Sequence, residues 1–143
     1  MKAIALVLSL ISFSAFADLT GSFSGTGAVS SDIGMSLVCE SIHFDLTQNA
    51  QSFILKGSVK CGDQFDIEYD ESTITIVNGR LFYQNQDVGS INADEVRLKY
   101  IETDENGQLM TLTTNFTKKG NVLQFEQGMA TAQYSIFIKG DLK

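Results

Sequence analysis

The chain has 143 residues, with 17 acidic against 10 basic side chains and a formal net charge of −7. Binding to phosphate backbones depends on Lys and Arg that replace counterions, so this charge argues against nucleic acid as a partner. It leaves a neutral ligand or a basic protein. The sequence holds two cysteines and one histidine. Because a metal site usually needs three or four ligands, we predict neither a metal site nor a cofactor.

Residues 1–17 form the first predicted element. Lys2 precedes an apolar run over residues 3–11, and Ala15-Phe16-Ala17 has the small-x-small pattern that signal peptidase accepts. The run is too short for a membrane span, which needs about 20 residues, and no second long apolar run follows. We expect a cleaved secretory signal peptide, with an N-terminal core helix as the alternative. The protein would then be secreted or periplasmic, in keeping with a bacterial source, and residues 18–143 would form one soluble domain.

The next stretch, Gly21–Gly27, has the sequence GSFSGTG. A phosphate-binding loop would follow a strand and open a helix, and this stretch does neither. Gly21, Gly25 and Gly27 lie at even spacing from Phe23, which places all four residues on the inner face of one bent first strand. The missing side chains either allow the strand to coil sharply or leave space inside the fold.

Cys39 and Cys61 are the two cysteines of the chain. An even pair in an exported protein indicates a disulfide bond, and two free buried thiols are the alternative. No sequence feature near either cysteine marks a reactive thiol, so we expect the bond to be structural.

The strands that carry these cysteines form a predicted hairpin in which Phe44 lies opposite Leu55. In that register Cys39 points away from the face of its partner, whereas a disulfide needs both side chains on compatible sides. One extra residue in one strand reconciles the two demands. We therefore predict a β-bulge near Gly57 or near Glu40-Ser41.

The middle and C-terminal parts of the chain alternate between apolar and polar residues with a period of two, which is the strand pattern. Asn78-Gly79 is a two-residue hairpin signal that pairs Ile76 with Leu81. Further along, turn residues pair Tyr100 with Met110.

A last hairpin pairs Phe125 with Tyr134 through a loop over residues 128–131. These connections are short and keep the apolar residues on one face, so they predict an all-β fold. We expect an antiparallel up-and-down meander of about ten strands that closes into a barrel, because closure removes exposed edges. A β-sandwich is the alternative that the pattern leaves open.

The glycine-aromatic start of the first strand, Gly21-Ser22-Phe23 followed by Gly25 and Gly27, resembles the lipocalin-like (calycin) β-barrels, with Phe23 in place of their usual tryptophan. The resemblance implies a small exported barrel with an interior cavity for a small apolar ligand.

Aromatic and aliphatic residues on the inner face are the cavity candidates. They are Phe23, Phe44, Phe53, Leu55, Phe65, Tyr83, Tyr100, Phe116, Phe125 and Tyr134. The same residues would equally fill a small barrel that has no cavity, so the pattern leaves a filled interior and an open one as alternatives.

The expected function is therefore binding of a small apolar ligand by a monomer without enzymatic activity. No nucleophile-elbow motif is present, and His43, on the predicted outer face, has no evident Ser or Cys partner in the sequence. The alternative function is a protein-interaction module or an inhibitor. Its acidic outer face, with Asp66, Glu68 and Asp70, would bind a basic partner.

Overall fold

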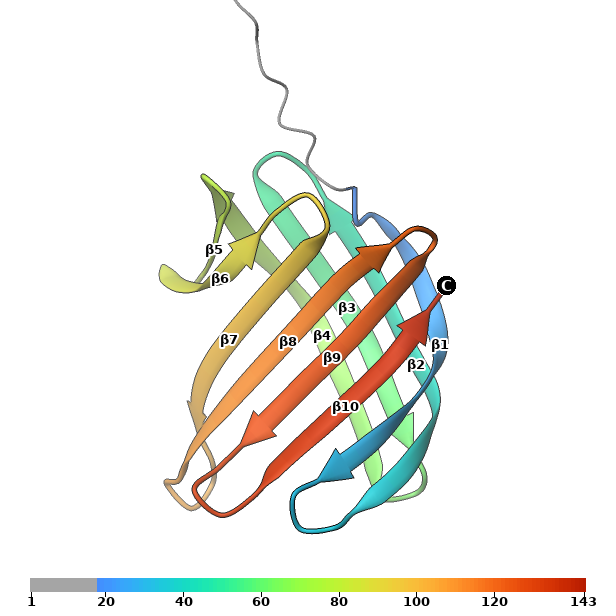
Figure 1. Ribbon diagram of the computed structural model, residues 1–143. Helices are drawn as coiled ribbons and strands as arrows, with labels where there is room; N and C mark the ends of the chain where they lie inside the picture. The colour runs from blue at the N-terminus through green and yellow to red at the C-terminus, as the bar shows by residue number, and fades with distance from the viewer. Residues whose placement is uncertain (1–17) are drawn as a thin grey trace, which may run out of the picture.

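The structure is a computed structural model that describes residues 18–143, and Figure 1 shows its course. The predicted signal peptide over residues 1–17 lies outside the described residues. The described chain forms ten strands: β1 (Gly21–Ser31), β2 (Ser36–Gln48), β3 (Ser52–Cys61), β4 (Phe65–Val77), β5 (Arg80–Tyr83), β6 (Gln86–Ile91), β7 (Glu95–Thr103), β8 (Leu109–Lys119), β9 (Val122–Ala130) and β10 (Ser135–Leu142).

The ten strands form a single antiparallel meander in which each strand pairs with its neighbour in sequence and β1 pairs with β10. The barrel is therefore closed, which confirms the predicted fold class and excludes the sandwich. Side chains alternate between the interior and the surface along nearly every strand. Within the described residues, no helix has the length and apolarity that crossing a membrane requires.

The predicted strand registers are confirmed at one hairpin and shifted at three. Asn78 and Gly79 both have positive φ angles, and Ile76 lies opposite Leu81 as expected. By contrast, Phe44 lies opposite Gly57 and not Leu55.

The other two shifts are in the C-terminal half. Tyr100 pairs with Leu112 and not Met110, a displacement of two residues that leaves the inner face unchanged. Phe125 pairs with Gly140, because Tyr134 belongs to the turn before β10 and not to the strand.

The predicted bulge and disulfide both occur. The register of β1 against β2 shifts between Gly25 and Gly27, where the β2 partner moves from Ile42 to Cys39. Glu40 and Ser41 are consecutive exposed residues in β2, so they form the extra-residue step. This step turns Cys39 inward, where it forms a disulfide bond with Cys61 across 22 positions of sequence.

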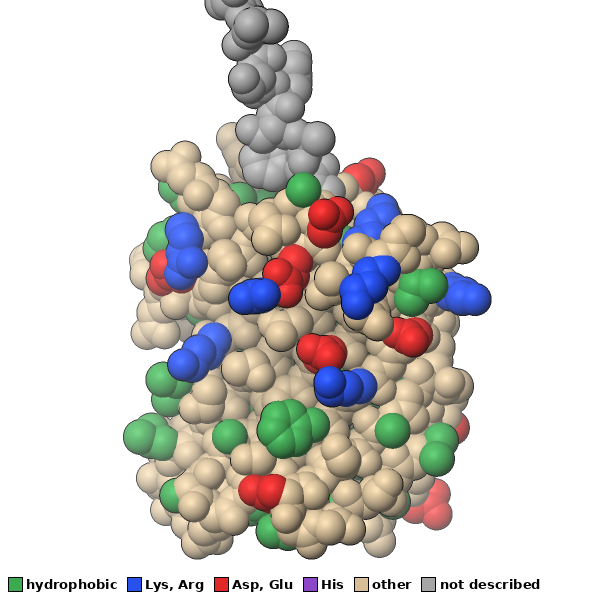
Figure 2. Space-filling model, in the orientation of Figure 1, with side chains coloured by type: hydrophobic (Ala, Val, Ile, Leu, Met, Phe, Trp, Pro, Cys, Tyr) green, Lys and Arg blue, Asp and Glu red, His purple; other side chains and the backbone are tan. Residues whose placement is uncertain are grey.

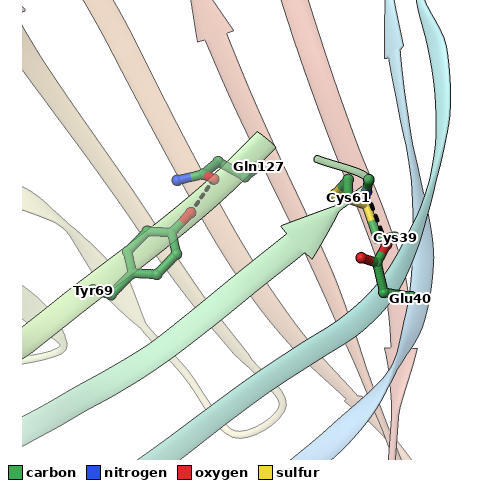
Figure 3. Close-up of a disulfide and its surroundings, with 6 residues drawn as sticks. Cys39, Glu40, Cys61, Tyr69 and Gln127 are labelled. Carbon is green, nitrogen blue, oxygen red and sulfur yellow. Dashed lines mark hydrogen bonds between the residues drawn. A yellow bond between two sulfur atoms is a disulfide. The ribbon is translucent and has the colours of Figure 1, made fainter. Parts of the chain in front are cut away.

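Both cysteines are fully buried, and Figure 3 shows the bond at the end of β3. The carboxylate of Glu40 accepts a hydrogen bond of 2.8 Å from the backbone N–H of Gly62 beside it. This bond lowers the pKa of Glu40 below its usual value.

A cluster of aromatic rings from β2, β3, β8 and β9 packs inside the barrel. The Phe44 ring centroid lies 5.0 Å from that of Phe116 and 4.7 Å from that of Phe125. Phe53 lies 6.4 Å from Phe116, and all four phenylalanines are fully buried. Offset and edge-to-face rings at these separations pack favourably, so this cluster is the centre of the core.

Glycines under this core allow the close packing. A Cβ at Gly27 would overlap the backbone carbonyl oxygen of Lys139 and the side chain of Ile42. A Cβ at Gly57 would overlap the Phe44 ring. Gly25 and Gly27 of β1 therefore leave no empty space, since the β10 backbone and neighbouring side chains approach them closely.

The barrel wall is incomplete between β4 and β7. Only Thr75, Ile76 and Val77 of β4 pair with β5, and only residues 96–98 of β7 pair with β6. The short β5–β6 hairpin thus closes the barrel near one end, at the upper left of Figure 1. Below it, long segments of β4 and β7 face the opening without a strand between them.

Candidate functional site

A cavity of about 260 Å³ lies inside the barrel on the side of the incomplete wall. Its lining comes from β2, β3, β4, β5, β7, β8 and β9. The lining residues are Phe44, Leu55, Tyr69, Asp70, Ser72, Tyr83, Leu98, Tyr100, Glu102, Leu112, Thr114 and Gln127. The lining combines aliphatic and aromatic side chains with a few polar groups, as small-molecule sites do.

The cavity opens between β4 and β7. Asp70 of β4 and Glu102 of β7 are exposed and also line it, so they form its mouth. An outer hollow of about 570 Å³ lies against the same region and shares Tyr83, Tyr100 and Glu102 with the cavity. The cavity is therefore open to solvent through the side of the barrel.

A second bulge places Asp70 at the mouth. Between Leu55 and Gly57 of β3, the β4 partner changes from Ser72 to Tyr69, so β4 contains one extra residue. Asp70 and Glu71 are consecutive exposed residues at this step. Bulges redirect side chains, and this one brings an otherwise outward carboxylate to the rim.

Glu102 reaches the rim for a different reason. It lies two residues after Tyr100 and four after Leu98, so it shares their inward face in β7. It stays exposed because β6 pairs with β7 only as far as Leu98. The incomplete wall thus leaves a charged side chain at an inward position in contact with water.

A polar network crosses the cavity floor. The Tyr69 hydroxyl donates a hydrogen bond to Gln127 Oε1, as Figure 3 shows. Gln127 Nε2 donates to Thr114 Oγ1 over 3.5 Å. Gln127 is only 6% exposed and Thr114 8%. An amide NH₂ group carries two hydrogens, so Gln127 retains one that is not used in this network.

Two cavity tyrosines have strongly perturbed acidity. Burial raises the pKa of Tyr69 to about 12. The hydrogen bond to Gln127 lowers this pKa, but its effect is smaller than that of burial. Burial, with the neighbouring Tyr83 and Glu102, raises the pKa of Tyr100 to about 12. Both hydroxyls are neutral at physiological pH, and that of Tyr69 donates to Gln127.

The structure brings four of the ten predicted cavity residues together: Phe44, Leu55, Tyr83 and Tyr100. Phe53, Phe116 and Phe125 are buried in the packed core, while Phe23 and Phe65 are half-buried against it. The prediction for Tyr134 is wrong. It is 37% exposed in the turn over residues 131–134, which lets the chain reverse before β10.

The sequence reasoning missed eight of the lining residues. Glu102, Thr114 and Gln127 carry a usable signal, because each is a polar residue at an inward position of an otherwise apolar strand face. Asp70 carries no such signal, since nothing in an acidic run marks where a bulge falls.

His43 lies on the outer face, as predicted, but it has a serine partner that the sequence did not indicate. Ser24 Oγ and His43 Nδ1 share a hydrogen bond of 2.7 Å, and His43 Nε2 lies 3.3 Å from Asp45 Oδ2. Hydrogen bonds from Ser22 and His43 lower the pKa of Asp45. The backbone N–H of Ser24 donates to the Lys143 carbonyl, so it is not free to stabilise an oxyanion.

The outer surface carries charges of both signs. Figure 2 shows basic and acidic side chains interspersed over the visible face. Lys139 and Glu126 form an ion pair of 2.9 Å on this surface. On the other side, acidic Asp66 of β4 lies opposite Lys60 of β3. A basic protein partner stays a prediction.

Among residues 18–143, no group of three metal-ligating side chains converges.

Fold and cavity together define a ten-stranded, up-and-down antiparallel barrel with a packed aromatic core and a cavity that opens through the wall. No protein-family model and no curated protein matches this chain. Among solved structures, a candidate outer membrane protein from Bacteroides fragilis aligns with 85% of this chain at 13% identity and a TM-score of 0.39. The aligned part is 50% of that protein, so this chain spans about half its length. At this level of similarity, the match assigns neither a family nor a function.

Proposed function

We propose that the protein is an exported, non-enzymatic binding protein with a lipocalin-like barrel that holds one small, mainly apolar molecule. The observation that carries the proposal is the cavity of about 260 Å³ beside a core that is otherwise close-packed. The cavity extends from solvent into the barrel and combines apolar with a few polar lining groups, which is the usual form of a small-molecule site.

The position of the cavity supports the proposal. It lies where the wall between β4 and β7 is interrupted, so a ligand would enter without unfolding of the barrel. Leu55, Leu98 and Leu112 would contact its apolar body. The unused amide hydrogen of Gln127 would orient an acceptor at its inner end.

The size of the cavity limits the ligand. Sites for drug-sized molecules measure roughly 300–1,000 Å³. A cavity of about 260 Å³ therefore suits a molecule with one ring or a short alkyl chain. A long fatty acid would not fit without movement of the wall.

Export is supported by the disulfide, because such bonds persist in oxidising compartments and are rare in the cytosol. The predicted signal peptide over residues 1–17 indicates the same secreted or periplasmic location.

Calorimetric titration with 2-phenylethanol tests the binding function. We expect saturable binding with one site per chain. Ser72→Trp places a large side chain in the cavity and should abolish the binding. Thr73→Trp is the matched control, because Thr73 is the next residue of β4 and is exposed. Equal binding by both variants would contradict a site in the cavity.

Native mass spectrometry of protein purified from its source provides an independent test. A co-purifying small molecule with one copy per chain would support the proposal. Repeated recovery of the unliganded mass, together with no binding of 2-phenylethanol, would refute it.

A further inference from the structure

We propose that the cavity selects a ligand with a protonated amine at its outer end, which would lie between Asp70 and Glu102 while the apolar body fills the interior. This inference rests on the proposed binding function and specifies its ligand class. It starts from the two carboxylates at the mouth, which reach the rim from opposite sides of the opening.

Both carboxylates are available to a ligand. Neither Asp70 nor Glu102 takes part in an ion pair within residues 18–143. The Asp70 backbone carbonyl accepts a bond from Ser72 Oγ, which leaves the side chain free. An ammonium group carries up to three donors, so two carboxylates and one further acceptor would satisfy it.

The tyrosines beside the mouth add a second attraction for a cation. Tyr83 and Tyr100 stand edge to face with ring centroids 6.2 Å apart, and both line the cavity and the outer hollow. Aromatic faces attract cations within about 6 Å of the ring centroid. An amine that enters past these rings therefore meets favourable electrostatics along the path.

The nearby basic side chains do not cancel this preference. The cavity lining contains no Lys, Arg or His. Arg80 and Lys99 line the outer hollow, but Arg80 is engaged with Asp87 at 2.7 Å, and Lys99 lies on the outward face of β7. A ligand with a carboxylate would meet like charges at the mouth and no compensating cation inside.

Another role for these carboxylates is protection of the strand edges. Inward-pointing charges at unpaired strands discourage edge-to-edge association. That role requires only negative charge at the opening. It does not predict discrimination among small ligands of equal size, so ligand selectivity separates the two roles.

The test compares three probes of similar size by calorimetry at low salt: 2-phenylethylamine, 2-phenylethanol and 3-phenylpropanoate. We expect the amine to bind on the order of tenfold more tightly than the alcohol, and the carboxylate more weakly than either. The preference for the amine should shrink as NaCl is added, because the mouth is exposed.

The variant Asp70→Asn/Glu102→Gln should bind the amine and the alcohol with similar affinity. Asp66→Asn/Glu68→Gln removes the same charge from the outer face of β4 and should keep the preference. Equal binding of all three probes to the wild-type protein, or loss of the preference in both variants, would overturn the amine assignment and leave the binding function intact. Failure of every probe to bind would contradict both.

Discussion

Replacement of Tyr69 with Phe tests the polar floor of the cavity. The substitution removes the hydroxyl that donates to Gln127 Oε1 and changes little else in shape. Gln127 is only 6% exposed, so its side chain depends mainly on protein partners for hydrogen bonds. A buried acceptor left without a partner costs about 1–3 kcal/mol, and we expect the free energy of unfolding to fall by that amount.

The double variant Tyr69→Phe/Gln127→Leu sharpens the test. It removes both polar partners together, and replacement of both groups by apolar ones of similar shape is nearly neutral. We therefore expect the double variant to be at least as stable as Tyr69→Phe alone, with a favourable coupling of about 1–2 kcal/mol between the two changes.

Urea denaturation followed by far-ultraviolet circular dichroism measures these free energies. Tyr134→Phe is the matched control, because Tyr134 is 37% exposed in a turn and should lose little stability. Additive losses in the double variant, or a Tyr69→Phe protein as stable as the wild type, would refute the assignment of a buried, coupled hydrogen bond.

Three further predictions concern the disulfide, the packed core and alkaline pH. Cys39→Ala/Cys61→Ala opens a loop of 22 positions and should lower the free energy of unfolding by about 3 kcal/mol in a urea titration; an unchanged midpoint would contradict this. Gly27→Ala forces a Cβ against the Lys139 carbonyl and should cost about 1–3 kcal/mol in a thermal melt, whereas a melting temperature equal to that of the wild type would show that the site has space. The folded-state pKa of Tyr69, raised by burial to about 12, predicts a stability contribution that is complete below pH 10 and is lost as pH rises through 12. That loss is at most about 3 kcal/mol, and Tyr69→Phe should remove it from a pH series of urea titrations; an identical alkaline decline in the variant would count against it.

The fold could be predicted from the sequence because alternation with a period of two fixes which face of each strand is buried. Alternation cannot distinguish two registers that differ by two residues, because such a shift leaves every side chain on the same face. This explains why Phe44 and Tyr100 were predicted on the correct face but opposite the wrong partners. The hairpin at Asn78-Gly79 was predicted correctly because its turn type also sets the loop length.

The bulges at Glu40-Ser41 and Asp70-Glu71 show why one irregularity was predictable and another was not. The step at Glu40-Ser41 follows from a covalent demand, because the cysteines must share a face. The step at Asp70-Glu71 satisfies no such demand that the sequence reveals. It is the second bulge that brings a carboxylate to the cavity mouth.

The cavity itself depends on differences between strands that alternation does not encode. A filled interior and an open one could not be distinguished from the sequence. The barrel contains a filled core and an open cavity. Ile42 and Phe44 fill the space over Gly27 and Gly57. The opening arises because β5 and β6 are short, so that β4 and β7 remain apart over most of their length.

The central claim is that the barrel is open to a ligand at the cavity between β4 and β7, while the core beside this cavity is filled. Methyl resonances of leucine-labelled protein, followed during titration with 2-phenylethanol, test it directly. We predict saturable shifts for Leu55, Leu98 and Leu112, which line the cavity, and none for Leu123 and Leu142, which are fully buried outside it. Unchanged cavity resonances at saturating probe, or equal shifts for the cavity leucines and the two core leucines, would contradict the account.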